Sequence, residues 1–243
     1  MMEALFHGDA YLREFRAVVT GIDEPRAAVT LDRTAFYPGG GGQPHDTGAL
    51  HLPGDVIDVV KVKKDGGKIL HLLTAGADIP DEGSSVTGVL DWDRRYKLMR
   101  THTAMHILCG VVWRDYGAQV TGGNMEPLEG RMDFEFERME RELVDEIEAK
   151  INAEVEAARD VVVRTMPREE AEQIPDLIRT KINLVPPSIT EIRTVEIEGL
   201  DLQADGGTHV ANTREVGLLR IVDYKSKGRI NKRIRVALEQ DPA

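Results

Sequence analysis

Cysteine is nearly absent from this sequence, since Cys109 is the only one in 243 residues. A single thiol excludes disulfides within the chain and metal sites built from cysteines alone, such as zinc ribbons, and we expect no disulfide partner. No apolar run approaches the roughly 18 residues of a membrane-spanning helix, so we expect no membrane association. The first nine residues lack a basic segment followed by an apolar one, which argues against a secretory signal and predicts a cytoplasmic protein.

Positive charge is also scarce. Lys and Arg number 31 against 42 Asp and Glu, which gives a net charge of −11 and argues against a nonspecific nucleic-acid coat. The basic residues are nevertheless concentrated near the C-terminus, because residues 220–235 contain Asp223 as their only acidic residue. Any polyanion that binds this chain should therefore contact this stretch.

Short runs rich in Val, Ile and Leu fill the first 90 residues, and clusters of Gly, Pro and Asp separate them. Several short strands at such spacing favour a small β-barrel over alternating strands and helices. The expected strands are residues 14–20, 28–32, 56–62, 69–73 and 84–90. We therefore predict an N-terminal β-barrel-like domain over residues 1–90.

The hydrophobic period changes after residue 90. Asp93 is expected to cap a helix over residues 94–113, and apolar residues every three or four positions predict a second helix over 136–158. The remaining elements are expected as a strand at 161–165, a short helix at 168–179, and strands at 189–197 and 218–223, with a last strand pair bracketing residues 226–228. The predicted fold class is α+β, with an α+β domain over residues 91–243.

Two histidines, His102 and His106, lie four residues apart on the first predicted helix. This spacing places both rings on one face, with Cβ atoms about 6 Å apart. The pair suits a single zinc ion, whose nitrogen ligands lie at about 2.0–2.1 Å, although such pairs also occur in helices without metal. Thr103 stands where metalloproteases of the HExxH type carry their glutamate, which disfavours a protease.

Cys109 lies on the same helical face as His102, but seven residues away. The helical rise between them is about 10.5 Å, too far for one ion to bind both. We expect Cys109 to be a small buried residue.

A second histidine motif lies far along the chain, where His209 follows a pair of glycines, Gly206 and Gly207. The glycines permit a tight loop that directs His209 toward His102 and His106. Alone, the motif favours a glycine turn with an incidental surface histidine. Three imidazoles, however, match the composition of an open catalytic zinc site.

Together these motifs resemble the AlaX family of freestanding alanyl-tRNA editing proteins, which is related to the editing domain of alanyl-tRNA synthetase. The family pattern is HxxxH on a helix, followed far downstream by CxxxH. Residues 102–106 match the first half, and residues 205–209 match the second with Asp205 in place of cysteine. The glycine-rich residues 34–48 also resemble the family. The presence of both an N-terminal barrel and an editing domain is typical of the medium-length type.

This resemblance implies hydrolysis of the ester between a wrong amino acid and alanine tRNA, with serine as the main error and glycine as a second one. A separate step is needed because a pocket for alanine discriminates against such neighbours by only about 10–200-fold. The implied cofactor is one Zn²⁺ per chain and the implied partner is mischarged alanine tRNA. Thr34 is the candidate hydrogen-bond donor to the serine hydroxyl, and the other candidates for substrate binding are Gly40, Gly41, Gly42, Gln43 and Asp46.

Asp205 leaves two arrangements open. It can be the fourth ligand beside His102, His106 and His209, at about 2.0–2.2 Å from the ion, or it can lie outside the ligand set and orient a bound water. These four residues are the candidate catalytic group. An alternative function is a tRNA-binding relative that has lost metal-dependent activity through the aspartate, and a third is a hydrolase of other esters.

The basic stretch near the C-terminus predicts a surface hairpin. Such runs of charge are often a solvated surface with no ligand. Concentrated positive charge in an acidic protein also suits the positioning of phosphates without base readout. The candidate RNA-binding residues are Lys225, Lys227, Arg229, Lys232 and Arg233.

Overall fold

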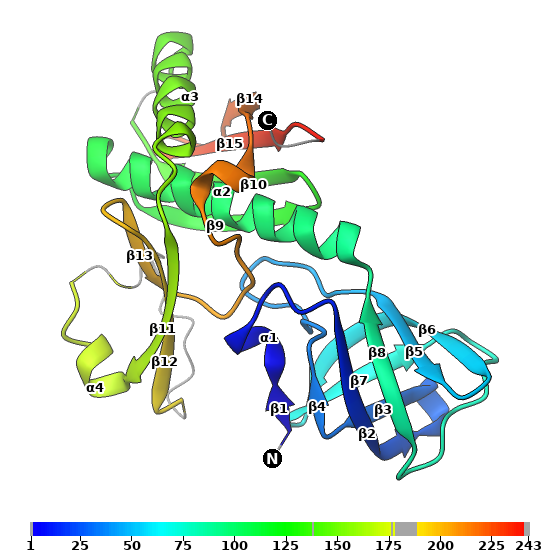
Figure 1. The fold of residues 1–243 in the computed structure, drawn as a ribbon. Helices are drawn as coiled ribbons and strands as arrows, with labels where there is room; N and C mark the ends of the chain where they lie inside the picture. Colours follow the sequence, from blue (N-terminus) through cyan, green and yellow to red (C-terminus); the bar gives the residue numbers. More distant parts are fainter. Residues whose placement is uncertain (1, 138, 176, 178–188, 241–243) are drawn as a thin grey trace. The chain divides into compact units, whose positions relative to one another are not determined.

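The structure is a computed structural model that describes residues 2–137, 139–175, 177 and 189–240. The predicted α+β class is confirmed, and the chain divides into two compact units, Met1–Lys97 and Leu98–Ala243 (Figure 1). No helix among the described residues is long and apolar enough to cross a membrane.

A closed barrel of six strands, in the order β2-β3-β7-β6-β5-β8, forms most of the first unit and confirms the predicted barrel. The elements of this unit are β1 (Glu3–Ala4), α1 (Leu5–Gly8), β2 (Glu14–Asp23), the 3-10 helix η1 (Glu24–Arg26), β3 (Ala28–Leu31), β4 (Arg33–Thr34), β5 (Gly48–Leu52), β6 (Asp55–Asp65), β7 (Lys68–Leu73) and β8 (Ser85–Leu90). The predicted strands are all present, whereas β5 of the barrel and the two-residue strands β1 and β4 were not predicted.

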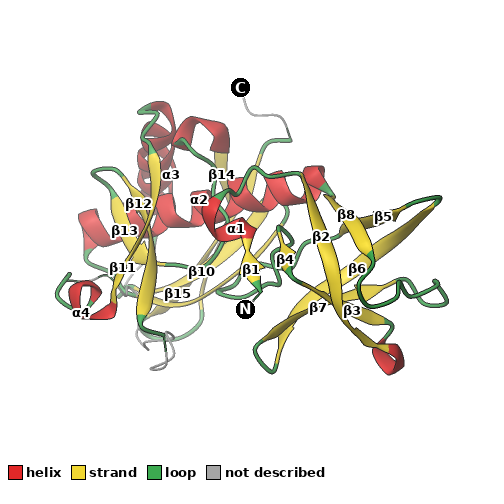
Figure 2. Ribbon diagram, turned by 60° about the horizontal axis from the view of Figure 1, so that its bottom comes forward, coloured by secondary structure: helices red, strands yellow, loops and turns green. Residues whose placement is uncertain are grey.

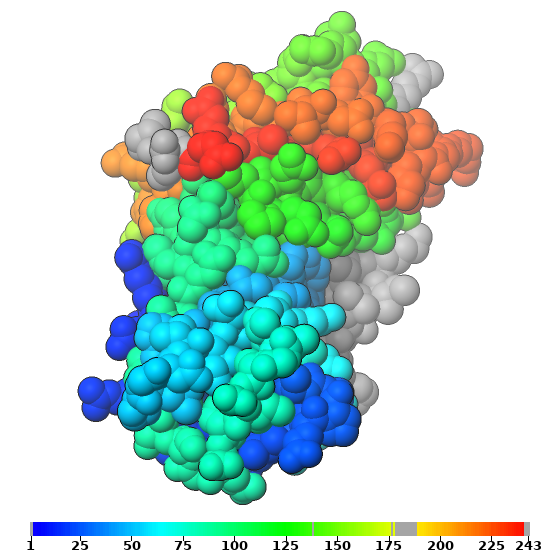
Figure 3. Space-filling model, turned by 90° about the vertical axis from the view of Figure 1, so that its right-hand side faces the viewer, coloured from blue at the N-terminus to red at the C-terminus, as the bar shows by residue number. Residues whose placement is uncertain are grey.

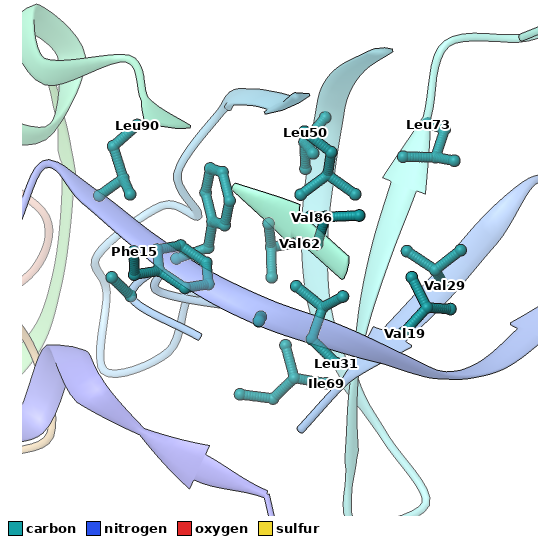
Figure 4. Packing of buried hydrophobic residues seen from close by; sticks show 14 of the residues in the cluster. Phe15, Val19, Val29, Leu31, Leu50, Val62, Ile69, Leu73, Val86 and Leu90 are labelled. Atoms are coloured by element: carbon teal, nitrogen blue, oxygen red, sulfur yellow. The ribbon is translucent and has the colours of Figure 1, made fainter. Parts of the chain in front are cut away.

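Alternation along the strands builds the core of the barrel. In β2, Phe15, Ala17 and Val19 are buried while their neighbours are exposed, because successive side chains point to opposite faces of a strand. Figure 4 shows apolar side chains from several strands, among them Val29, Leu50 and Val86, gathered in the interior. Such burial stabilises the unit by roughly 1.5–3 kcal/mol for each large aliphatic side chain.

The glycine-rich segment between β4 and β5 contains a tight turn. Gly40 and Gln43 exchange two backbone hydrogen bonds of 3.0 and 2.9 Å. The two residues between them, Gly41 and Gly42, have φ angles of 59° and 91°, a region that glycine adopts without the strain of a Cβ atom. The turn therefore presents backbone rather than side chains.

A buried ion pair holds this segment in place. The Asp46 carboxylate accepts a hydrogen bond of 2.6 Å from the Tyr37 amide and pairs with the Arg95 guanidinium, and neither ion has appreciable exposed surface. Arg95 also donates to the carbonyl oxygens of Ala10 and Ala35. The chain before and after the glycines is thus tied to one guanidinium.

Helix α2 (Trp92–Tyr116) begins at the end of the first unit and continues into the second. Its N-terminus is capped by Asp91, whose carboxylate accepts from the Arg94 amide at 3.2 Å, so the prediction of Asp93 as the cap was wrong. Asp93 lies in the first turn and pairs with Lys97 instead. The helix ends before Gly117, which has a φ of 63°.

The second unit contains two sheets (Figure 2), with strand orders β14-β15-β10-β9 and β11-β12-β13. After α2, its elements are β9 (Val120–Glu126), β10 (Glu129–Glu135), α3 (Arg141–Glu156), β11 (Val161–Pro167), α4 (Arg168–Ala171), β12 (Glu191–Ile197), β13 (Asp201–Ala204), the 3-10 helix η2 (Thr213–Val216), β14 (Leu219–Ser226) and β15 (Asn231–Leu238).

Several predicted boundaries in this unit are corrected. The helix predicted from residue 136 starts at Arg141, because the Phe136 amide donates to the Ile230 carbonyl at 2.7 Å and continues the sheet. The helix predicted over 168–179 ends at Ala171, and residues 176, 178 and 179 lie outside the described residues. The pair β14–β15 confirms the hairpin around residues 226–228.

Helix α2 packs closely against both sheets of the second unit. A Cβ atom on Gly130 of β10 would lie 2.4 Å from the Met105 sulfur, and one on Gly110 would lie 2.9 Å from Leu200, which immediately precedes β13. Absence of side chains at these two glycines permits the approach. The face of α2 that carries His102 and His106 is thereby fixed within the second unit.

Candidate functional site

Three imidazoles and one carboxylate converge in the second unit. His102 and His106 come from α2, Asp205 directly follows β13, and His209 lies in the loop before η2. One possible ligand atom from each of the four residues lies within 4.8 Å of the others. The expectation that the glycine loop places His209 beside His102 and His106 is therefore confirmed.

The rings are close and shielded from water. The centroids of His102 and His209 are 4.2 Å apart, and that of His106 lies 5.2 Å from the first and 4.7 Å from the second. All three histidines are buried, and the Asp205 side chain is 12% exposed. Among the four side chains, that of Asp205 has the largest exposed fraction.

The loop that carries His209 is ordered by hydrogen bonds around Asp205 and Thr103. The Gly207 amide donates to the Asp205 carboxylate at 2.6 Å, which closes a tight turn through the glycine pair. The Val210 amide donates to the Thr103 hydroxyl at 3.2 Å, and Arg193 donates to the Asp205 carbonyl at 2.9 Å. Thr103, which directly follows His102 in α2, thus anchors the loop that carries His209.

Two outer groups contact the Nδ1 atoms of the histidines. Asp201 Oδ2 lies 3.0 Å from His106 Nδ1, and Thr103 Oγ1 lies 3.2 Å from His209 Nδ1. The Asp201 carboxylate only accepts hydrogen bonds, so His106 carries its proton on Nδ1 and its Nε2 is an electron-pair donor. His209 contacts the Thr103 hydroxyl through Nδ1 and the Asp205 carboxylate, 3.1 Å away, through Nε2. This is the arrangement in which a carboxylate or hydroxyl orients a metal-binding histidine.

Electrostatics favour neutral imidazoles beside an ionised carboxylate. Burial lowers the pKa of His102 to about 4 and holds the pKa of His209 well below its usual range. Burial acts to raise the pKa of Asp205, but the neighbouring imidazoles of His102 and His209 outweigh it and keep that pKa well below the usual range. At neutral pH, neutral rings of His102 and His209 therefore lie beside a negative charge on Asp205.

These donors fit a divalent metal ion. Ligand atoms around a tetrahedral zinc with bonds of about 2.0–2.2 Å lie about 3.3–3.6 Å apart. Asp205 lies 3.6 Å from His102 Nε2 and 3.1 Å from His209 Nε2, close to that range without an ion. Cys109 is buried and does not belong to the group, as predicted.

The candidate substrate-binding residues belong to the first unit. Thr34, Gln43 and Asp46 are buried, whereas Gly40, Gly41 and Gly42 form the exposed turn. The Thr34 hydroxyl lies 2.8 Å from His71 Nε2 and accepts from the Phe36 amide at 3.1 Å. The carboxylate of Asp46 is occupied by Arg95 and the Tyr37 amide.

The five candidate RNA-binding residues lie on or beside the β14–β15 hairpin, whose atoms are coloured orange to red at the surface in Figure 3. Lys225, Lys227 and Arg229 are exposed. Lys232 is only 5% exposed, and its ammonium donates to two carbonyls of the turn at 2.8 and 2.9 Å. Arg233 is paired with Asp133 of β10, with a shortest contact of 2.6 Å.

Comparisons with known proteins place these features in a family. Residues 5–94 match the family model described as tRNA synthetases class II (A), and residues 192–235 match the threonyl and alanyl tRNA synthetase second additional domain. Both models describe parts of aminoacyl-tRNA synthetases, so the chain belongs to this class of tRNA-associated domains.

Curated relatives specify the family further. The chain is 40% identical to the alanyl-tRNA editing protein AlaX-M of Saccharolobus solfataricus over 96% of its own length and 98% of that protein. It is 39% identical to AlaX-M of Methanosarcina mazei over 98% and 97%. It is also 41% identical to the alanine–tRNA ligase of Ignicoccus hospitalis, over 91% of this chain and 24% of the ligase. The chain belongs to the AlaX family of alanyl-tRNA editing proteins, of the AlaX-M type.

Sequence reasoning missed the residues that orient the histidines. Thr103 is adjacent to His102, and Asp201 lies four residues before Asp205, but neither spacing signals a contact by itself. The Asp201–His106 contact arises only because α2 packs against β13. His71, whose ring contacts the Thr34 hydroxyl, also carries no motif that indicates its role.

Proposed function

We propose that this chain hydrolyses the ester that joins a wrong amino acid to alanine tRNA, with serine esters as main substrates and glycine esters as second ones. Convergence of His102, His106, Asp205 and His209 in a chain of the AlaX-M type is the observation that carries this proposal. The reaction takes place in the cytoplasm, where aminoacyl-tRNA is used.

The proposed cofactor is one Zn²⁺ per chain. His102, His106 and His209 would hold it, with Asp205 as the fourth ligand rather than an outer group. When bound, the ion would polarise the ester carbonyl, lower the pKa of a water, or anchor the substrate. Asp205 contributes the charge that three neutral imidazoles lack.

The protein residues around the ligands have separate tasks. Asp201 holds His106 in the tautomer that leaves Nε2 free to donate an electron pair, and Thr103 positions the ring of His209 through Nδ1. Burial excludes bulk water from the rings, which strengthens electrostatic interactions within the group. Preorganised groups of this kind need no reorganisation when charge develops on the ester.

Selection of the amino acid is assigned to the first unit. We propose that Thr34 hydrogen-bonds the serine hydroxyl and that Gly40, Gly41 and Gly42 present backbone toward the terminal adenosine, beside Gln43. Thr34 has no exposed surface, so a substrate reaches it with a rearrangement of neighbouring side chains. Asp46 acts by holding the segment through Arg95.

Contacts to tRNA phosphates are assigned to the exposed cations of the hairpin, Lys225 and Arg229, and to Lys227, whose ammonium lies 3.4 Å from Asp133 but whose side chain is 40% exposed. Lys232 and Arg233 act mainly by shaping the hairpin, because their charged groups are bound to carbonyls and to Asp133.

Deacylation of serine-, glycine- and alanine-charged alanine tRNA, together with metal analysis, tests the proposal. We expect near-stoichiometric zinc and release of serine and, more slowly, glycine. His102→Ala and His209→Ala should lose the metal and the activity with little loss of fold. A variant of either histidine that kept both zinc and activity would contradict the site assignment. Binding of tRNA without turnover would support a non-catalytic relative, and turnover of small esters only would support another hydrolase.

A further inference from the structure

The hydroxyl of Thr34 is held by two groups within the first unit. His71 Nε2 lies 2.8 Å from Oγ1, and the Phe36 amide donates to the same oxygen at 3.1 Å. Thr34 and His71 are both fully buried, so water does not compete for these contacts. The positions of the protons in this pair determine what the hydroxyl offers to a further partner.

The other nitrogen of the His71 ring determines its tautomer. Nδ1 lies 3.3 Å from the carbonyl oxygen of Val29, its cross-strand neighbour. A carbonyl oxygen only accepts hydrogen bonds, so Nδ1 carries the proton. Burial lowers the pKa of His71 to about 4, and the ring is therefore neutral at physiological pH. In this tautomer Nε2 is an acceptor.

The proton of Thr34 is consequently committed to His71. A hydroxyl has one proton to donate and two lone pairs to accept with. At Thr34 the proton points to Nε2 and one lone pair receives the Phe36 amide. The second lone pair of the Thr34 hydroxyl remains, and it can accept one further hydrogen bond.

We infer that His71 is a positioning residue that makes Thr34 a hydrogen-bond acceptor, so that this site selects an aminoacyl ester whose side chain donates a hydrogen bond. This inference rests on the proposed function and reverses the direction expected from the sequence, in which Thr34 donates. A seryl hydroxyl can donate to Thr34, whereas glycine and alanine offer no side-chain donor. His71 thereby acts on selectivity through Thr34 without touching the substrate.

The first test is the tautomer of His71 in the ligand-free full-length chain. Nitrogen NMR distinguishes a protonated from an unprotonated ring nitrogen, and His71→Gln identifies the signal. We expect a neutral ring with the proton on Nδ1. A proton on Nε2 would overturn the inference, whatever the activity of the protein.

The second test is the ratio of kcat/KM for serine- and glycine-charged alanine tRNA. Loss of one neutral hydrogen-bond partner corresponds to about a 2- to 13-fold change. We expect Thr34→Val and His71→Leu each to lower the ratio by about this factor, and His71→Gln, which offers a carbonyl acceptor, to retain part of it. The exposed His51 of the same barrel gives a matched control, and His51→Leu should leave the ratio unchanged.

The double variant Thr34→Val/His71→Leu separates the inference from a general effect on the fold. If His71 acts through the Thr34 hydroxyl, His71→Leu should change the ratio no further in the Thr34→Val background. A further fall there, or an unchanged ratio in His71→Leu alone, would overturn the inference. A wild-type chain that hydrolyses neither ester would instead contradict the proposed function, which the tautomer measurement does not depend on.

Discussion

Protonation of His71 should couple the stability of the barrel to pH. The ring is completely buried, and its pKa falls from 6.5 to about 4. A histidine with a lowered pKa in the folded state favours folding while it is neutral, and its contribution is lost as pH falls from the unfolded value through the folded one. The full shift corresponds to about 3 kcal/mol. Between about pH 7 and about pH 5, the loss amounts to about 2 kcal/mol.

Urea unfolding of the wild type and of His71→Leu at these two pH values measures the contribution of His71 to the free energy of unfolding. Other titrating groups, His102 included, contribute to both proteins and cancel in the difference. The wild type should lose about 2 kcal/mol more than the variant between about pH 7 and about pH 5. Equal losses in the two proteins would refute the reasoning, because they would show that the ring is not protonated on unfolding in this range.

Three further predictions concern the metal group, the glycine-rich segment and the hairpin. Asp201→Asn should weaken zinc binding about 10–100-fold in a chelator competition, because His106 loses its carboxylate partner, whereas the exposed Glu198→Gln should not; equal affinities would exclude an orienting role. Asp46→Ala leaves the Arg95 charge buried without its partner and should cost about 3–5 kcal/mol in urea unfolding, more than the apolar pair Asp46→Leu/Arg95→Met; a smaller loss in the single variant would argue against the anchor. Lys225→Ala and Arg229→Ala should each weaken tRNA binding and reduce its salt slope by about 1, and an unchanged slope would remove these residues from the interface.

The barrel was predictable because its strands alternate apolar and polar residues between strong turn signals. Strand β5 was missed because its only fully buried side chain is Leu50, and one such residue gives no alternation. The start of α3 was misplaced for a related reason. Phe136 and Met139 fall in phase with the apolar stripe of the helix, but the hydrogen bond from Phe136 to Ile230 assigns that part of the chain to the sheet.

The part of the metal group that depends on local spacing in the sequence was predictable. A helical pair of histidines and a glycine turn before a third are visible in the sequence, and the structure brings them together. The orienting partners were not predictable, because Asp201 and His106 meet through the packing of α2 on β13. The proton direction at Thr34 likewise depends on His71, 37 residues away, and on the carbonyl of Val29.

For the basic residues near the C-terminus, the sequence does not predict which side chains are accessible. Composition identified the hairpin as the most basic part of the chain, but not which cations are available to a partner. Lys232 and Arg233 look the same in the sequence as Lys225 and Arg229. Burial and the pairing with Asp133 separate them only in the folded chain.

Metal-dependent deacylation of seryl alanine tRNA tests the central claim most directly. The chain is stripped with a chelator, and activity is followed while Zn²⁺ is added back in measured amounts. Activity should be lost on stripping and should rise linearly to a plateau at one Zn²⁺ per chain, with no recovery in His209→Ala. Full activity in the stripped wild type, or a plateau reached equally by His209→Ala, would contradict the account.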